Sequence, residues 1–195
     1  MDMTEIVATR AAGTPLQEIA DKLSVQDLRD LTNASIDEML ESIRDCTDHD
    51  VTFVPVDPDA HDPAAADEAV VNLAWTLGHV IVHATASGEE YGFTGTQLAR
   101  GVPFFDRPRY EVPWQEMQTI EQCRHRLEES RRMRLAMLDV WPDEPHLDVT
   151  YSPSPRVGEI NAVAAFLRGL LHDADHQDQV REIVRQAKEA RAATA

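Results

Sequence analysis

The sequence has little positive charge for its length. Its 195 residues include 18 Lys and Arg against 35 Asp and Glu, so the formal net charge is −17 at pH 7. Proteins that bind nucleic acids need a basic face, because Lys and Arg displace counterions from the phosphates. Anionic membrane surfaces attract basic segments in the same way. We therefore expect neither a nucleic acid nor a membrane as a partner.

The sequence also has only two cysteines, and its first residues do not resemble a leader. Cys46 and Cys123 do not form a CxxC motif, so a disulfide framework is not expected and a reducing compartment fits the sequence. The first ten residues (MDMTEIVATR) have neither the basic start nor the apolar core of a signal peptide. We expect a cytoplasmic protein.

No apolar run suits the interior of a bilayer. The longest, residues 69–86, carries Asn72, Thr76, His79 and His83, and a polar line of this kind is costly in lipid. We interpret this run as a buried helix. With 43% hydrophobic and 27% charged residues, the composition is that of a globular protein, and we expect a single domain over residues 1–195.

A helical period dominates the sequence, and the alternation typical of strands is absent. Thr14 and Ser24 are expected to cap the first two helices, and the Pro-rich, acidic segment 46–68 is expected to be a loop with a solvated rim. The predicted helices cover residues 15–23, 25–43, 63–87 or 67–87 with a continuation to 100, 114–141 and 158–190. Four long helices predict an all-α fold, a four-helix bundle.

Two HxxxH pairs carry the strongest chemical signal. His79 and His83 lie four residues apart, as do His172 and His176, so on a helix each pair lies on one face about one turn apart. One such pair is common in protein cores. Two pairs on two helices that could face each other indicate a metal site more strongly.

The helix that carries His83 is apolar nearly all round except for one polar stripe, which holds Asn72, Thr76, His79 and Glu90. A buried polar stripe must be satisfied inside the protein, either by a structural hydrogen-bond network or by a metal site. On the last helix, Ala165 and Gly169 precede His172 on its own face. These small residues indicate either a cavity beside the histidines or close packing of two helices.

Both motifs resemble those of the DinB/YfiT-like superfamily of metalloenzymes. WTLGHVIVH (residues 75–83) is similar to its second-helix motif, and HDADHQDQ (residues 172–179) is similar to its fourth-helix HxxxHxxQ motif. The resemblance implies a helical bundle with His83, His172 and His176 as metal ligands and Gln179 as the closing residue. Members often have Arg-Gly where this chain has Gln177 and Asp178, so a role for that dipeptide does not carry over.

His79 lies one turn before the first matched ligand. It could be a fourth ligand, a hydrogen-bond donor to a ligand or a proton shuttle. We favour the last two, because three protein ligands and an open position already describe a catalytic site. Glu90 could act as a general base or orient a substrate, but we favour a solvated position beyond a bend at Gly88.

Three imidazoles suit a divalent transition metal, with zinc or nickel first and iron next. Such a metal lowers the pKa of a bound water or thiol. The superfamily includes mycothiol-dependent maleylpyruvate isomerase and bacillithiol S-transferases, so the resemblance implies a thiol S-transferase or isomerase that acts on a small-molecule substrate. An anionic substrate would need arginines near the cavity. The candidates, for each of which we favour a surface position, are Arg100, Arg107, Arg109 and Arg168.

The alternative to an enzyme is a non-enzymatic helical bundle, either a metal-binding stress protein or a dimer with structural histidines. An exchangeable ligand on the metal would favour the enzyme, and a closed site of four histidines would favour the structural protein. The resemblance to the superfamily also implies a homodimer, and we expect its interface on the apolar faces of the first and third long helices.

Overall fold

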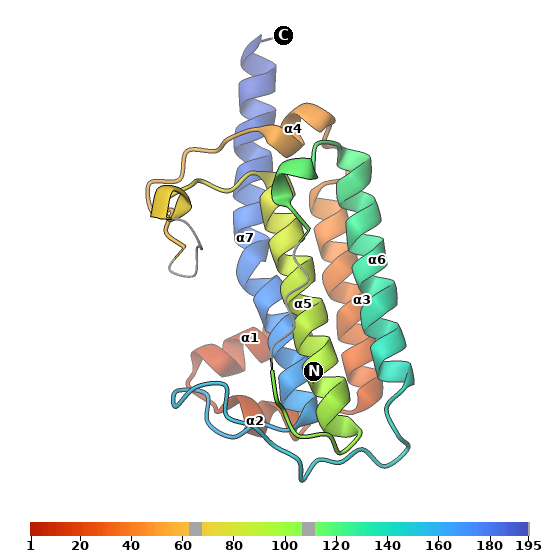
Figure 1. Ribbon diagram of the computed structural model, residues 1–195. Helices are drawn as coiled ribbons and strands as arrows, with labels where there is room; N and C mark the ends of the chain where they lie inside the picture. Colours follow the sequence, from red (N-terminus) through yellow and green to blue (C-terminus); the bar gives the residue numbers. More distant parts are fainter. Residues whose placement is uncertain (63–67, 107–111, 195) are drawn as a thin grey trace.

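The computed structural model describes residues 1–62, 68–106 and 112–194, and this part of the chain is helical (Figure 1). Its elements are α1 (Met3–Ala11), α2 (Leu16–Ala20), α3 (Val25–Ser42), α4 (Asp48–Thr52), η1 (Glu68–Val70), α5 (Leu77–Ala99), η2 (Trp114–Glu116), α6 (Ile120–Asp139) and α7 (Ala162–Thr194). Over these residues, β structure is limited to one bridge between Tyr151 and Ile160. The predicted all-α class is confirmed. No helix among them is both long and apolar enough to cross a bilayer.

The four long helices α3, α5, α6 and α7 lie side by side (Figure 1). Helix α5 packs against α7 and α6, and α3 packs against the same two helices. The short helices α1 and α2 lie near one end of this arrangement, and α4 lies near the other.

Two hydrophobic clusters fill the interior. One contains Leu28, Leu98 and Phe166, and the other contains Ile36, Val80 and Val180. All four long helices also contribute buried polar side chains, and these include Thr32 and Ser35 on α3, Thr85, Ser87, Glu89, Glu90 and Thr94 on α5, Ser130 and Arg134 on α6, and Asp173 and Gln177 on α7. We call this set the polar layer. On α5, His79 and His83 precede the members of this set in the sequence. On α7, Asp173 directly follows His172, and Gln177 directly follows His176.

Capping side chains determine where the long helices begin. Ser24 caps α3 as predicted, in a capping box with Asp27. Helix α5 begins after Thr76, whose hydroxyl accepts a hydrogen bond from the His79 backbone N–H. The predicted start at residue 63 or 67 is therefore wrong, because Thr76 has extended backbone angles. Residue 63 and residue 67 themselves lie outside the described residues.

Other predicted boundaries also need correction. Pro15 is the N-cap of α2 rather than its first residue, and Thr119 caps α6, so this helix begins six residues later than predicted. Helices α1 and α4 were not predicted, because each is short. Helix α5 runs through Gly88 without a break, and α7 extends to Thr194.

Small residues let α5 approach α7 closely. A Cβ atom on Gly169 would lie 3.1 Å from both the Cα and the carbonyl oxygen of Gly88. The close-packing interpretation of Gly169 is therefore correct, and the helices that carry the histidines are held near each other at this point.

Gly95 makes the same kind of contact further along α5. A Cβ atom there would lie 2.8 Å from the Ala162 carbonyl oxygen, which is backbone and cannot turn aside. We expect Gly95→Ala to lower the free energy of unfolding by about 1–3 kcal/mol, as overpacking does. Gly92→Ala is the matched control, because its Cβ would meet the flexible Met137 side chain at 3.0 Å. Urea denaturation measures both variants, and equal stability of the two would contradict this account.

Candidate metal centre

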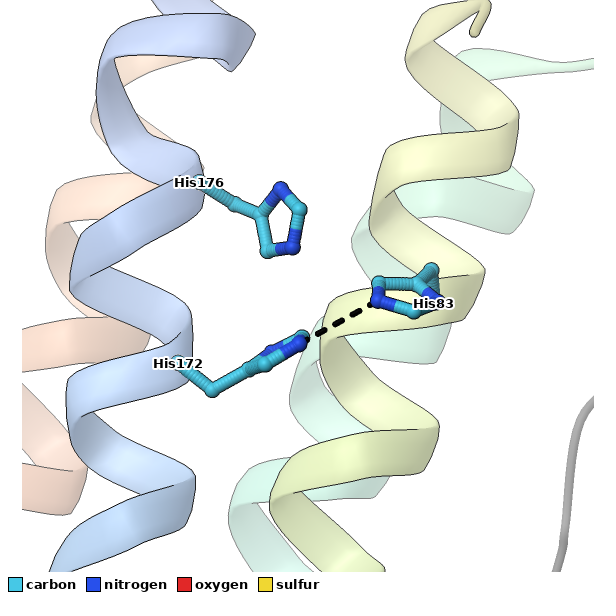
Figure 2. Close-up of side chains that lie close together, drawn as sticks. All are labelled: His83, His172 and His176. Atoms are coloured by element: carbon cyan, nitrogen blue, oxygen red, sulfur yellow. Dashed lines mark hydrogen bonds between the residues drawn. The ribbon is translucent and has the colours of Figure 1, made fainter. Parts of the chain in front are cut away.

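The structure brings three of the four motif histidines together. His83 on α5 faces His172 and His176 on α7 (Figure 2), and their ligand atoms all lie within 4.8 Å of one another. The Nε2 atoms of His83 and His172 are 3.2 Å apart. This convergence requires both the i, i+4 spacing on α7 and the contact between α5 and α7.

The donor set fits a divalent transition metal. Two nitrogens bound at about 2.0–2.1 Å with tetrahedral angles are about 3.3 Å apart, close to the separation of the His83 and His172 nitrogens. The Nδ1 atom of His176 lies 2.8 Å from the Gln179 side-chain oxygen. Since an amide oxygen only accepts, Nδ1 carries the proton, and Nε2 keeps its lone pair for a metal. Gln179 thus orients His176.

His79 does not join the other histidines. Its ring stacks on Trp75, with centroids 4.3 Å apart, and on Trp114, with centroids 4.7 Å apart. The side chain is only 9% exposed. Among the described residues, the group that could hold a metal consists of His83, His172 and His176, so a fourth-ligand role for His79 finds no support in this geometry.

Trp75 is a site residue that sequence reasoning did not assign, although it opens the quoted motif. Its ring centroid lies 4.7 Å from that of His83 and 6.0 Å from that of His176. The indole therefore covers one side of the histidine cluster. Its spacing of four and eight residues from His79 and His83 was the available signal.

Burial, with a smaller contribution from the His83 imidazole, lowers the pKa of His79 from 6.5 to about 4. As the pH falls, His79 is protonated near pH 6.5 in the unfolded chain but only near pH 4 in the folded protein. The contribution of neutral His79 to the free energy of unfolding is therefore fully present above pH 6.5 and is lost progressively as the pH falls toward 4. We expect His79→Phe to flatten the loss of metal-free stability between pH 6.5 and 4, measured by urea denaturation. The exposed His125→Phe is the control. Parallel curves for wild type and His79→Phe would contradict the expectation.

Glu90 is 4% exposed, so the favoured solvated position is wrong. The reason is that α5 continues through Gly88 and carries Glu90 into the polar layer. Glu90 lines a cavity of about 180 Å³ together with Tyr91 and Arg168. It is not part of the histidine cluster, and a catalytic role for it stays a prediction.

A larger cavity of about 520 Å³ opens beside His172. Arg168 lines it and is half-buried rather than fully exposed. Arg100 instead donates to the Val140 carbonyl oxygen at 2.8 Å in an exposed contact. Arg107 and Arg109 lie outside the described residues.

The acidic segment 46–68 borders His176, the second histidine of α7. Asp57, Asp59 and Asp62 line a cavity of about 230 Å³ that also includes His176 and Gln179. Part of the predicted solvated rim therefore borders the histidine cluster. The negative charge of these residues would favour the approach of a cation.

No family model, no curated protein and no solved structure matches this chain. The resemblance to the DinB/YfiT-like superfamily therefore depends on the motif residues alone. The class that the structure establishes is a helical protein with three histidines close enough to hold a metal ion.

Proposed function

We propose that this protein is a metal-dependent enzyme with a four-helix bundle of the DinB/YfiT-like type. The observation that carries the proposal is the convergence of His83, His172 and His176 within 4.8 Å, beside a cavity large enough for a small molecule. In this proposal the three imidazoles hold one divalent transition metal, with zinc or nickel first and iron next.

The surroundings of the histidines support a catalytic rather than a closed structural site. His79 is packed between two tryptophans, so three protein ligands leave a coordination position for a substrate. The 520 Å³ cavity reaches His172 and offers a route to that position. Gln179 holds His176 in the tautomer that a metal needs.

The proposed reaction class is transfer or isomerisation that depends on a low-molecular-weight thiol. A divalent metal, when bound, would lower the pKa of the thiol toward neutrality. In an S-transfer, the thiol sulfur forms a bond to the electrophilic carbon of the acceptor. The leaving group departs with the electron pair of the broken bond, and the thiol proton is released to water. In this proposal the Trp75 indole, whose ring lies against His83 and His176, shields one side of the cluster.

Metal analysis tests the proposal. We expect the purified protein, loaded with zinc or nickel, to bind one metal ion per chain, and anomalous scattering followed by X-ray absorption to report three imidazole nitrogens and one exchangeable ligand. A panel of low-molecular-weight thiols with electrophilic acceptors should then give metal-dependent turnover. A closed site of four histidines without turnover would instead establish the non-enzymatic metal-binding protein, and absence of metal binding would overturn both.

A further inference from the structure

The arginines of this acidic protein are almost all engaged. Within residues 1–62, 68–106 and 112–194, every arginine but two donates to a carboxylate or to a carbonyl oxygen, and these engaged residues are Arg10, Arg29, Arg44, Arg100, Arg124, Arg126, Arg131, Arg132, Arg134, Arg181, Arg185 and Arg191. The two exceptions are Arg156 and Arg168, and both line the 520 Å³ cavity beside His172.

Arg168 is oriented toward this site by its place on α7. It lies four residues before His172, so both side chains leave the same face of the helix one turn apart. Its guanidinium carbon lies 4.6 Å from the centroid of the Tyr91 ring, a cation–π contact that limits the freedom of a long side chain. A pre-positioned guanidinium loses less entropy when it binds a ligand.

The remaining charges around the cavity do not cancel this pair. Arg10 also lines it, but Arg10 is paired with Asp175, the carboxylate of the same wall. Glu90 lines the adjacent 180 Å³ cavity and not this one. The cavity therefore holds two positive charges in excess. Its other lining residues include the apolar Leu16, Val157 and Leu171.

The net charge of −17 does not prevent an anion from binding here. At physiological ionic strength the Debye length is about 8 Å, so distant surface carboxylates are largely screened. A guanidinium in contact with a carboxylate, sulfonate or phosphate group is screened much less, and the planar fork can bind such a group through two hydrogen bonds.

We infer that the 520 Å³ cavity binds an organic anion, whose charged group contacts Arg168 and Arg156 and whose apolar part lies against Leu16 and Leu171. Because the cavity reaches His172, this anion is the substrate, or the part of it that is held in place while the reacting atom lies at the histidine cluster. The identification of the anion as a substrate rests on the proposed function. The anion site itself does not.

Calorimetric titration of the metal-free protein with benzoate and with benzamide tests the inference, because the two probes have nearly the same shape and differ in charge. We expect benzoate to bind at least about 10-fold more tightly than benzamide, a difference of about 1.4 kcal/mol. Arg168→Gln should remove this preference and Arg156→Gln should reduce it. Arg132→Gln is the control, since this arginine is 70% exposed and paired on the surface of α6.

Equal affinity for the two probes, or an equal loss in the Arg132→Gln variant, would overturn the anion site. If Arg168→Gln does not fold, as judged by circular dichroism, Arg156→Gln decides the outcome, because Arg156 is exposed. Zinc titration of the same variants separates the two proposals. Benzoate preference without zinc binding would overturn the metal centre alone, and zinc binding without benzoate preference would overturn the anion site alone.

Discussion

Replacement of any one of His83, His172 and His176 by alanine is expected to reduce zinc affinity by about 10-fold or more. Each imidazole supplies one of three converging nitrogens, and changes even in residues that only orient such ligands cost about 10–100-fold. Competition with a chromogenic chelator measures the affinity. Because neutral imidazole is the ligand, binding should also weaken as the pH falls below the pKa of free histidine.

His125→Ala provides the matched control for this series, because its ring lies on α6 with a side chain that is 73% exposed. It should bind zinc as the wild type does. His79→Ala should retain most of the affinity, since His79 is packed between Trp75 and Trp114 rather than against the cluster. Unchanged stoichiometry and affinity in all three site variants would refute the assignment of the ligands.

Removal of the Asp173 carboxylate is expected to cause the largest loss of stability. Asp173 is fully buried and pairs with Arg134, which is 1% exposed. Ser35 donates to the same carboxylate at 3.0 Å, and Ser130 accepts from Arg134 at 3.0 Å. Asp173→Ala leaves the Arg134 charge buried without its partner, which should lower the free energy of unfolding by about 3–5 kcal/mol.

Asp175→Ala is the control for this variant, two residues further along α7. Its carboxylate pairs with Arg10 near the surface, where a lost ion pair costs about 0–1 kcal/mol. The double variant Arg134→Met/Asp173→Leu should recover most of the loss, because apolar side chains can replace a buried ion pair. Urea denaturation measures all four proteins. A loss in Asp173→Ala no larger than that in Asp175→Ala would contradict the role of the buried pair.

The fold class followed from local signals, and the polar layer did not. Apolar residues at helical spacing predicted α3 and α7, and Ser24 marked the start of α3. No local pattern predicts that Arg134 is buried, because an arginine in a helical pattern is usually solvated. It is buried because Asp173 of another helix neutralises it and because Gly88 leaves room for it: a Cβ atom on Gly88 would lie 2.5 Å from the Arg134 guanidinium carbon.

The boundaries of α5 show a second limit. The apolar pattern runs back through residues 69–76, but the chain there is not helical apart from a single turn, η1. Thr76 caps α5, and Trp75 lies against His79, His83 and His176. Hydrophobicity alone predicts a helix through Trp75, but in the structure Trp75 precedes the helix and its ring packs against the histidines.

The sequence by itself determined that His172 and His176 share one face of a helix, because i, i+4 geometry is local and needs no other part of the chain. Only the tertiary structure decided that His83 joins them while His79 does not, since His83 and His172 are 89 residues apart and meet through the close contact of Gly88 with Gly169. The burial of Glu90 and the open cavity beside Arg168 have the same origin. They depend on which helices pack together and how closely, and those distances are set by contacts between residues far apart in the chain.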